Sequence, residues 1–396
     1  MADLPPSSSD SLKPSATPSA SAFREPKSQH TSPWIHLALF LGTFASMVIV
    51  YSGVSEGPLK TRAIEGAEFA GTLALILLFH EFGHYFAARI HKVDTSLPYF
   101  IPFPIPGVSL LGTFGAVIRM RGTIPNRRAL LDIGASGPLA GLCIAIPAYF
   151  YGASHSSFVP MVGSDGMELG DSIALKLLDH FAQPVTPPGM ELSLNPIAFA
   201  AWGGMLVTMI NLFPVSQLDG GHVAYSILGP RQNKIGLVVH RAMLGFFFAS
   251  VVAYCVRDVR VGIGLYRFGT HVTNSMFWLV WYHVLIVLGS TTATDAALEA
   301  LPNRMSVRTR ISGLIGIFCL LWLGTEHDAP PFFWVAFTAG LVLFTLLDFR
   351  GGLFDDHKLL DHPDVGAPDL GIVRKVIAVV TLVWFVLLLM PAPITM

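Results

Sequence analysis

The chain has 396 residues, of which 52% are hydrophobic and only 13% are charged, and its mean hydropathy is +0.58. Soluble domains carry charge on roughly a quarter of their residues, so this composition excludes an ordinary soluble protein and indicates one that crosses a membrane several times. The formal net charge of -1 gives no electrostatic basis for binding nucleic acid. The three cysteines lie in apolar runs without C-x-x-C spacing, which predicts neither a disulfide framework nor a thiolate metal site.

Residues 1–33 are rich in serine and proline and contain too few apolar side chains to pack, so they are predicted to be a disordered tail. Nine apolar runs follow, and they predict an all-α polytopic membrane protein with about nine transmembrane helices. The first run starts near Trp34, and the others are 68–90, 129–150, 197–213, 234–256, 274–290, 310–325, 331–348 and 372–392. We expect residues 34–230 to form a transmembrane core and residues 231–396 to add further C-terminal helices.

The basic residues predict how the core is oriented in the membrane. If the tail is cytoplasmic, the segment that joins the second and third runs is also cytoplasmic. This segment carries Arg89, Lys92, Arg119, Arg121, Arg127 and Arg128. The loop 151–195, whose only lysine or arginine is Lys176, then lies outside, as the positive-inside rule expects. Arg257, Arg260 and Arg267 do not follow this pattern, so the orientation is predicted only up to about residue 230.

The run 68–90 contains three ionisable side chains close together, in the sequence HEFGH. His80 and His84 are four residues apart, so both emerge on one face of a helix. Glu81 adjoins them, and this is the H-E-x-x-H pattern, in which two imidazoles hold zinc and the carboxylate acts as general base. Ionisable groups are costly at membrane depth unless they are paired or functional, so we interpret the cluster as a metal site.

A catalytic zinc site has three protein ligands, so a third donor is expected at the same depth. The stretch INLFPVSQLDGGHVAYSI, residues 210–227, provides Asp219. Pro214, Gly220 and Gly221 interrupt the helix there, which a membrane protein tolerates only where the backbone lines a cavity or water. Asp219 is therefore the predicted third ligand. His222, three residues later, is either a supporting residue of that site or a histidine at the membrane interface.

These two motifs resemble the site-2 protease family of intramembrane zinc metalloproteases. The family signature is H-E-x-x-H in one transmembrane helix and N-x-x-P-x-x-x-L-D-G in a later one. It is matched by His80, Glu81, His84, Asn211, Pro214, Leu218, Asp219 and Gly220. The resemblance covers roughly residues 65–230. It implies hydrolysis of peptide bonds of transmembrane protein substrates within or near the lipid bilayer, with one Zn²⁺ per chain on His80, His84 and Asp219. Glu81 would be the base, and Asn211 would steady the substrate backbone or the oxyanion.

Two stretches between the motifs have their own interpretation. The sequence GTFGAVIRMRG, residues 112–122, follows a proline-rich segment and resembles the short re-entrant β-hairpin-like element of the family, whose strand edge could pair with an unwound substrate. An ordinary interfacial loop is the alternative. The sequence GASGPLAG, residues 134–141, predicts close helix packing, and we assign it no chemistry.

Two other functions compete with proteolysis. A metal transporter would need ionisable residues along several helices, and the remaining apolar runs are nearly free of them. A catalytically inactive relative that only binds membrane proteins would have lost Glu81 or a ligand, and all four residues are present. The expected location is a bacterial inner membrane, with a plastid membrane as the alternative because plant proteins of the family share the pattern.

Overall fold

The structure is a computed structural model, and it describes residues 31–106, 109–121, 123–160, 168–182, 187–262, 264, 267–292, 306–326, 330–349, 360–366 and 370–395. Residues 1–30 of the predicted tail lie outside the described residues.

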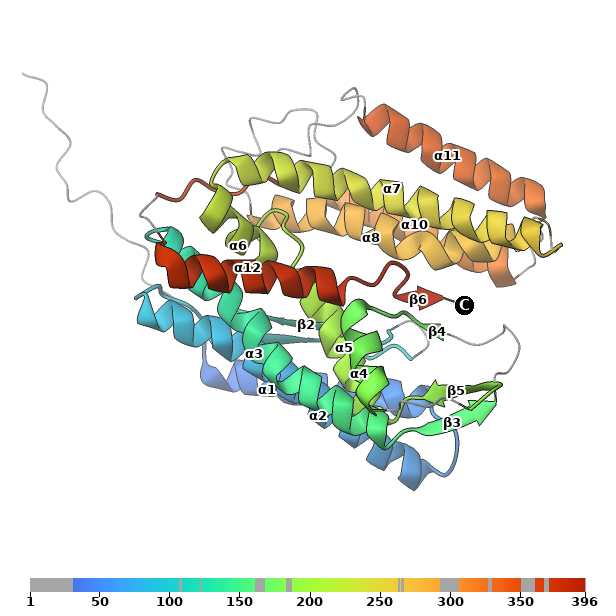
Figure 1. Cartoon of the computed structure of the whole chain (residues 1–396), viewed down its shortest axis with the longest axis horizontal. Coiled ribbons are helices and arrows are strands. Elements are labelled where there is room, and N and C mark those ends of the chain that lie inside the picture. The colour runs from blue at the N-terminus through green and yellow to red at the C-terminus, as the bar shows by residue number, and fades with distance from the viewer. Residues whose placement is uncertain are drawn as a thin grey trace, which may run out of the picture.

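The described part of the chain is mostly helical (Figure 1). Its helices are α1 (Pro33–Val54), α2 (Leu59–Ile90), α3 (Arg127–Ser154), α4 (Ile173–Ala182), α5 (Pro196–Asn211), α6 (Asp219–Leu228), α7 (Arg231–Arg260), α8 (Phe268–Thr292), α10 (Val307–Glu326), α11 (Pro331–Phe349) and α12 (Gly371–Leu388). Each of the nine predicted apolar runs overlaps one of these helices, although the runs 197–213 and 372–392 extend past the ends of α5 and α12, and α4 and α6 are additional short helices.

Six of the helices are long and apolar enough to cross a membrane: α1, α2, α3, α7, α8 and α12. The apolar part of α5, Pro196–Asn211, and that of α11, Phe332–Leu343, are shorter. The chain is therefore a multi-pass integral membrane protein. The number of nine spans remains a prediction, because length and composition support six within the described residues.

Three small antiparallel sheets of two strands each accompany the helices. They pair β1 (Tyr99–Pro102) with β2 (Thr113–Val117), β3 (Ser157–Pro160) with β5 (Met190–Ser193), and β4 (Glu168–Leu169) with β6 (Ile394–Thr395). Along the chain, β1 and β2 follow α2 and precede α3, and Tyr99 pairs with Val117. The other two pairs were not predicted, because strands of two to four residues leave little alternation to detect in a sequence.

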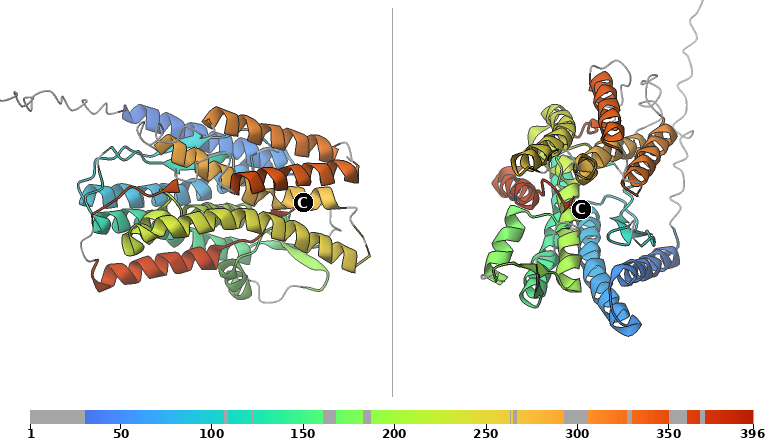
Figure 2. Two further views of the ribbon diagram at one scale, coloured as in Figure 1. Left: turned by 90° about the horizontal axis from the view of Figure 1, so that it is seen from above. Right: turned by 90° about the vertical axis from the view of Figure 1, so that its right-hand side faces the viewer.

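Helices α7, α8 and α12 run along the long axis of the molecule, while the short helix α4 runs across it (Figures 1 and 2). The main apolar core joins α3, α5, α7 and α8 around side chains such as Trp202, Phe247 and Trp278. Helix α1 holds the first strand pair, because Ser46 Oγ donates to the Gly112 carbonyl at 2.6 Å and His36 Nδ1 donates to the Pro98 carbonyl at 3.0 Å.

Candidate metal centre

Helix α2 carries three of the predicted site residues on its buried side. His80, Glu81 and His84 are 3%, 5% and 6% exposed. Ten residues, from Glu81 to Ile90, separate His80 from the end of the helix, so the site lies well inside the span. Burying two imidazoles and a carboxyl group in a membrane helix is costly unless they bind one another or an ion.

Asp219 starts α6, directly after the compact loop 212–218. The glycines after it are required by this loop: a Cβ on Gly220 would overlap the carbonyl of Leu212, and one on Gly221 would overlap the carbonyl of Ser216. The loop is also held from outside, because Gln232 Nε2 donates to the Pro214 carbonyl at 3.0 Å. The motif L-D-G-G thus turns the chain tightly enough to present the Asp219 carboxylate to α2.

The structure brings the three predicted ligands together. Asp219 Oδ2 lies 3.2 Å from His80 Nε2 and 3.3 Å from His84 Nε2. One ligand atom from each residue lies within 4.8 Å of the others, and this is the one such group of three among the described residues. At a tetrahedral zinc ion, with bonds of about 2.0–2.1 Å, neighbouring ligand atoms are about 3.3 Å apart. The two separations measured to Asp219 match that spacing.

The hydrogen bonds around the imidazoles fit a tautomer in which both Nε2 atoms are acceptors. His84 Nδ1 donates to the Ile133 carbonyl at 2.7 Å, which leaves a lone pair on Nε2 of the neutral ring. His80 Nε2 accepts from the Asn211 Nδ2 amide at 3.3 Å. Two lone pairs and one carboxylate oxygen therefore face one another. This donor set and its spacing fit a zinc ion.

The other two predicted residues lie beside this group. Asn211 ends α5, and its amide contacts His80 as described above. Glu81 is next to His80 on α2, and the backbone of Ile118, the residue after β2, forms a hydrogen bond with the Glu81 carboxylate. The first strand pair is thus in direct contact with the carboxyl group predicted to be the general base.

Three glycines of α3 allow this helix to approach the site, which sequence analysis did not foresee. A Cβ on Gly134 would lie 2.8 Å from His222 Cβ, and one on Gly137 would overlap the His84 imidazole. A Cβ on Gly141 would lie 3.4 Å from His80 Cβ. The stretch GASGPLAG therefore packs closely, as predicted, and it does so against the metal-site residues. Its glycine spacing of three and four residues was the available signal.

His222 lies one turn after Asp219 and is hydrogen-bonded to a residue far along the chain. Its Nδ1 is 2.8 Å from Nε2 of His362, and the His362 Nδ1 donates to the Pro363 carbonyl at 2.7 Å. The His362 ring also stacks on Tyr225, with ring centroids 4.1 Å apart. Burial lowers the pKa of His362, so its imidazole is neutral. His222 is therefore bound to the segment before α12, a partner that no local pattern could reveal, and its supporting role in the site stays a prediction.

Comparison with known proteins shows that part of the chain resembles a family of peptidases. Residues 68–253, which contain all the predicted site residues, match the model of peptidase family M50. This part of the chain is similar to the members of that family. Family M50 is the site-2 protease family that the two motifs resemble.

Relatives with curated names support the family. The Arabidopsis thaliana protein named probable zinc metalloprotease EGY2, chloroplastic, is 30% identical over 200 residues, which cover 48% of this chain and 34% of the relative. The Oryza sativa subsp. japonica protein named probable zinc metalloprotease EGY1, chloroplastic, is 34% identical over 165 residues, which cover 40% of this chain and 27% of the relative. The match thus spans about a third of the relatives' own length. No solved structure matches this chain.

The C-terminal helices contain more buried ionisable side chains than the sequence reading allowed. His271 Nε2 lies 2.8 Å from Asp258 Oδ2, between α8 and α7. His240 donates to the Tyr282 carbonyl at 2.8 Å, and His283 Nδ1 lies 3.0 Å from Arg310. His240, His283 and Arg310 lie within the predicted apolar runs, which therefore carry more ionisable groups than expected, whereas Asp258 and His271 lie between two of the runs. Among the described residues, however, they form separate pairs and no second group of metal donors.

Proposed function

We propose that this chain is an intramembrane zinc metalloendopeptidase that hydrolyses peptide bonds of transmembrane protein substrates. One observation carries the proposal: two imidazole lone pairs and a carboxylate oxygen converge at zinc spacing next to the buried carboxyl group of Glu81. The names of the relatives, which read "probable zinc metalloprotease", support zinc as the metal. The donor set supports one ion per chain.

Each residue of the site has a separate proposed role in hydrolysis. His80, His84 and Asp219 would hold Zn²⁺, which supplies Lewis acidity that polarises a peptide carbonyl and activates water. Glu81 accepts the proton of the attacking water and later delivers it to the leaving amine. The amide of Asn211 donates toward this point, where it can steady the substrate backbone or the developing oxyanion. The Ile133 carbonyl keeps the His84 ring in the tautomer that binds metal.

The first strand pair is proposed to present the substrate. A helix must unwind before its backbone can be cut, and an extended peptide can pair with a strand edge. Two observations support this role: the backbone after β2 contacts Glu81, and Phe114 on β2 is 67% exposed. We propose that the pair re-enters the membrane beside the metal. Cross-linking from a photoreactive side chain at Phe114 to a bound substrate peptide tests this placement, and the absence of any cross-link during cleavage would contradict it.

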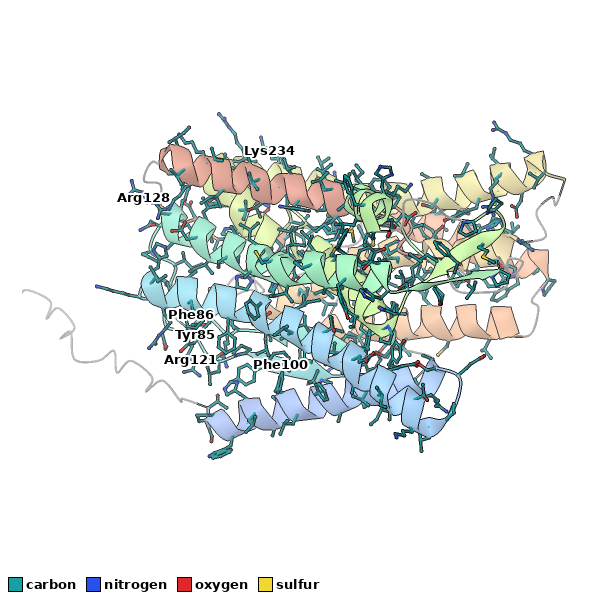
Figure 3. All side chains as sticks on the ribbon, turned by 60° about the horizontal axis from the view of Figure 1, so that its bottom comes forward. Tyr85, Phe86, Phe100, Arg121, Arg128 and Lys234 are labelled. Carbon is teal, nitrogen blue, oxygen red and sulfur yellow. The ribbon has the colours of Figure 1, made fainter. Side chains whose placement is uncertain are left out.

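The predicted organisation and orientation are kept as part of the proposal. Residues 34–230 form the metalloprotease core, and residues 231–396 add C-terminal helices. Arg121 and Arg128 lie toward the same end of the bundle (Figure 3), which supports a cytoplasmic position for that end. A bacterial inner membrane remains the proposed location, and the relatives' printed names support the plastid membrane as the alternative.

Reporter fusions test this orientation. An enzyme reporter that works only in the cytoplasm should be inactive when fused near residue 170 and active when fused near residue 121. The opposite pattern would reverse the assignment.

The mechanism is tested by separating the base from the ligands. Glu81→Gln keeps the size of the side chain but removes the carboxylate, so purified protein should retain zinc while hydrolysis of a membrane-spanning peptide largely stops. Asp219→Ala and His84→Ala remove a ligand and should lower zinc content together with activity. The two readouts are zinc per chain and peptide cleavage in the same vesicles.

The outcomes distinguish the competing functions. A cleaving Glu81→Gln protein would rule out the assigned base. A wild-type chain that binds zinc in vesicles without cleaving any transmembrane peptide would indicate an inactive relative. Zinc uptake into sealed vesicles that Asp219→Ala abolishes would indicate a transporter.

A further inference from the structure

Helix α4 has an exposed row of large apolar side chains. Ile173, Leu177 and Phe181 are spaced four residues apart and are 58%, 58% and 66% exposed. With ten residues the helix is about 15 Å long, which is too short to cross a bilayer. The exposed Lys176 and His180 flank the row on one side. This is the pattern of a helix that lies along a surface with one face against apolar material.

The opposite face of α4 is fixed to the rest of the protein. Ala174 and Leu175 are buried in the main core. The Tyr149 hydroxyl, in the last turns of α3, donates to Asp179 Oδ1 at 2.9 Å. The position and rotation of α4 are therefore determined by α3, and the apolar row must face outward.

The position of α4 in the chain places it near a membrane boundary. It follows the end of the spanning helix α3 and precedes α5, and it runs across the direction of the long helices (Figures 1 and 2). Phe150 and Tyr151, at the same end of α3, are also exposed, at 42% and 53%. Exposed apolar side chains therefore occur both on α4 and at the end of the span to which α4 is attached. Aromatic residues at such a boundary are typical of the interface between lipid and water.

We propose that α4 is an interfacial helix that rests its Ile173–Leu177–Phe181 row on the lipid bilayer. Lys176 can extend its amine to the headgroups while its stem lies on the apolar surface. A second copy of the chain is a poorer occupant, because three side chains on two turns offer far less than the roughly 800 Å² per partner of a stable interface. Arg127 and Arg128 begin α3 at its other end, so α4 lies at the boundary opposite to that basic cluster. This inference does not depend on the proposed protease activity.

Spin-label accessibility tests the proposal in the full chain. Cys143, Cys255 and Cys319 are first replaced by alanine, and single cysteines are then introduced at each position from 173 to 182 for labelling. The chain is reconstituted in phosphatidylcholine vesicles. Labels at Ile173, Leu177 and Phe181 should collide more often with oxygen, which partitions into lipid, than with a water-soluble nickel chelate. Labels at Ala174 and Leu175 should be shielded from both reagents.

Two control labels define the accessibility expected in lipid and in water. A label at Val383, an exposed position of the spanning helix α12, should show the lipid pattern, and a label at Ser157, exposed on β3, should favour the nickel chelate. A preference for the nickel chelate at all three row positions would overturn the proposal in favour of a water-exposed helix. Shielding of the row from both reagents, with broadening between labels on different chains, would overturn it in favour of a second copy.

Discussion

His80 and His84 turn their Nε2 atoms toward a single carboxylate, Asp219, whereas the buried histidines of residues 231–292 each bind a different neighbour. In the first region the hydrogen bonds leave lone pairs facing inward. In the second region each histidine contacts a carbonyl, a carboxylate or an arginine of an adjacent helix through one ring nitrogen. The comparison shows that convergence of lone pairs, and not the number of buried histidines, distinguishes a metal site from structural polar pairs.

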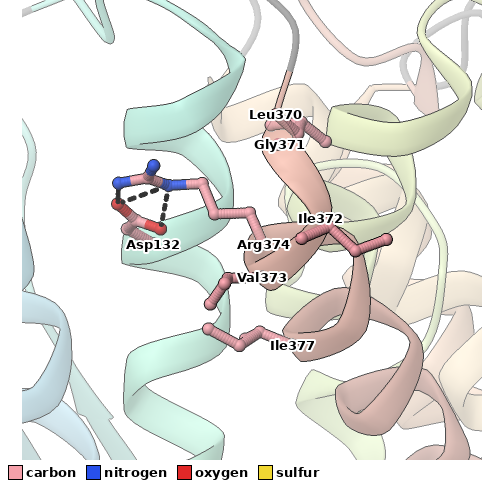
Figure 4. A pocket seen from close by; sticks show the side chains of 7 residues that line it. All are labelled: Asp132, Leu370, Gly371, Ile372, Val373, Arg374 and Ile377. Carbon is pink, nitrogen blue, oxygen red and sulfur yellow. Dashed lines mark hydrogen bonds and ion pairs between the residues drawn. The ribbon is translucent and has the colours of Figure 1, made fainter.

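The two regions are nevertheless joined around α6. Gln232 holds the loop before Asp219, and His362 holds His222 after it. Arg374 at the start of α12 forms a bidentate ion pair with Asp132 of α3, at 2.8–3.1 Å (Figure 4). This pair borders a cavity of about 370 Å³ that is otherwise lined by the first turns of α12. The C-terminal region therefore supports the helices that carry the site without contributing a metal donor among the described residues.

The largest effect is expected where α3 touches the metal site. Gly137→Ala would push a methyl group into the His84 imidazole, so zinc affinity should fall by about 10–100-fold, as when a group that orients a ligand is altered. Zinc affinity is measured by competition with a chelator. The matched control is Gly71→Ala on α2, where a Cβ meets nothing within 4 Å and zinc affinity should not change. Equal losses in both variants would mean that helix propensity or packing in general, and not contact with His84, is responsible.

A different effect is expected when a pair in the C-terminal region is broken. His271→Ala leaves the buried Asp258 carboxylate with only the longer contact to Arg257 Nε, at 3.4 Å, so the melting temperature should fall, because a buried carboxylate that loses a close partner is unfavourable. Zinc content per folded chain should stay at the wild-type value. Loss of zinc from folded His271→Ala protein would contradict the division into a metal region and a structural region.

The smallest effect is expected at the junction of the two regions. His362→Ala removes one hydrogen bond from His222, worth about 1 kcal/mol, and the ring stacked on Tyr225, so zinc affinity should fall less than tenfold. His362→Gln, whose side-chain carbonyl can accept from His222 Nδ1, should recover part of the loss. A zinc affinity that is unchanged in His362→Ala would show that His222 does not need this partner. Zinc affinity is measured by chelator competition at one pH for the wild type, His362→Ala and His362→Gln.

The parts of this molecule that could be predicted from the sequence are those set by short spacings. The face shared by His80 and His84 follows from helical geometry, and the turn before Asp219 follows from Pro214 and the two glycines. The structure brings these residues together, but their roles as ligands and base remain predictions. The contacts of His222 with His362 and of His84 with Ile133 join residues 140 and 49 positions apart, and no local pattern specifies them. The short pairs β3–β5 and β4–β6 escaped prediction for the same reason.

The place of His80 within α2 also sets a length scale for the products of cleavage. The ten residues from Glu81 to Ile90 correspond to about 15 Å of helix, which is half of a hydrocarbon layer of about 30 Å. A substrate helix that aligns with α2 would therefore be cut near its middle. Each fragment would keep about ten apolar residues, roughly half of what a stable span requires. Both fragments would then lose their anchorage, so a single scission would release protein toward the two sides of the membrane at once.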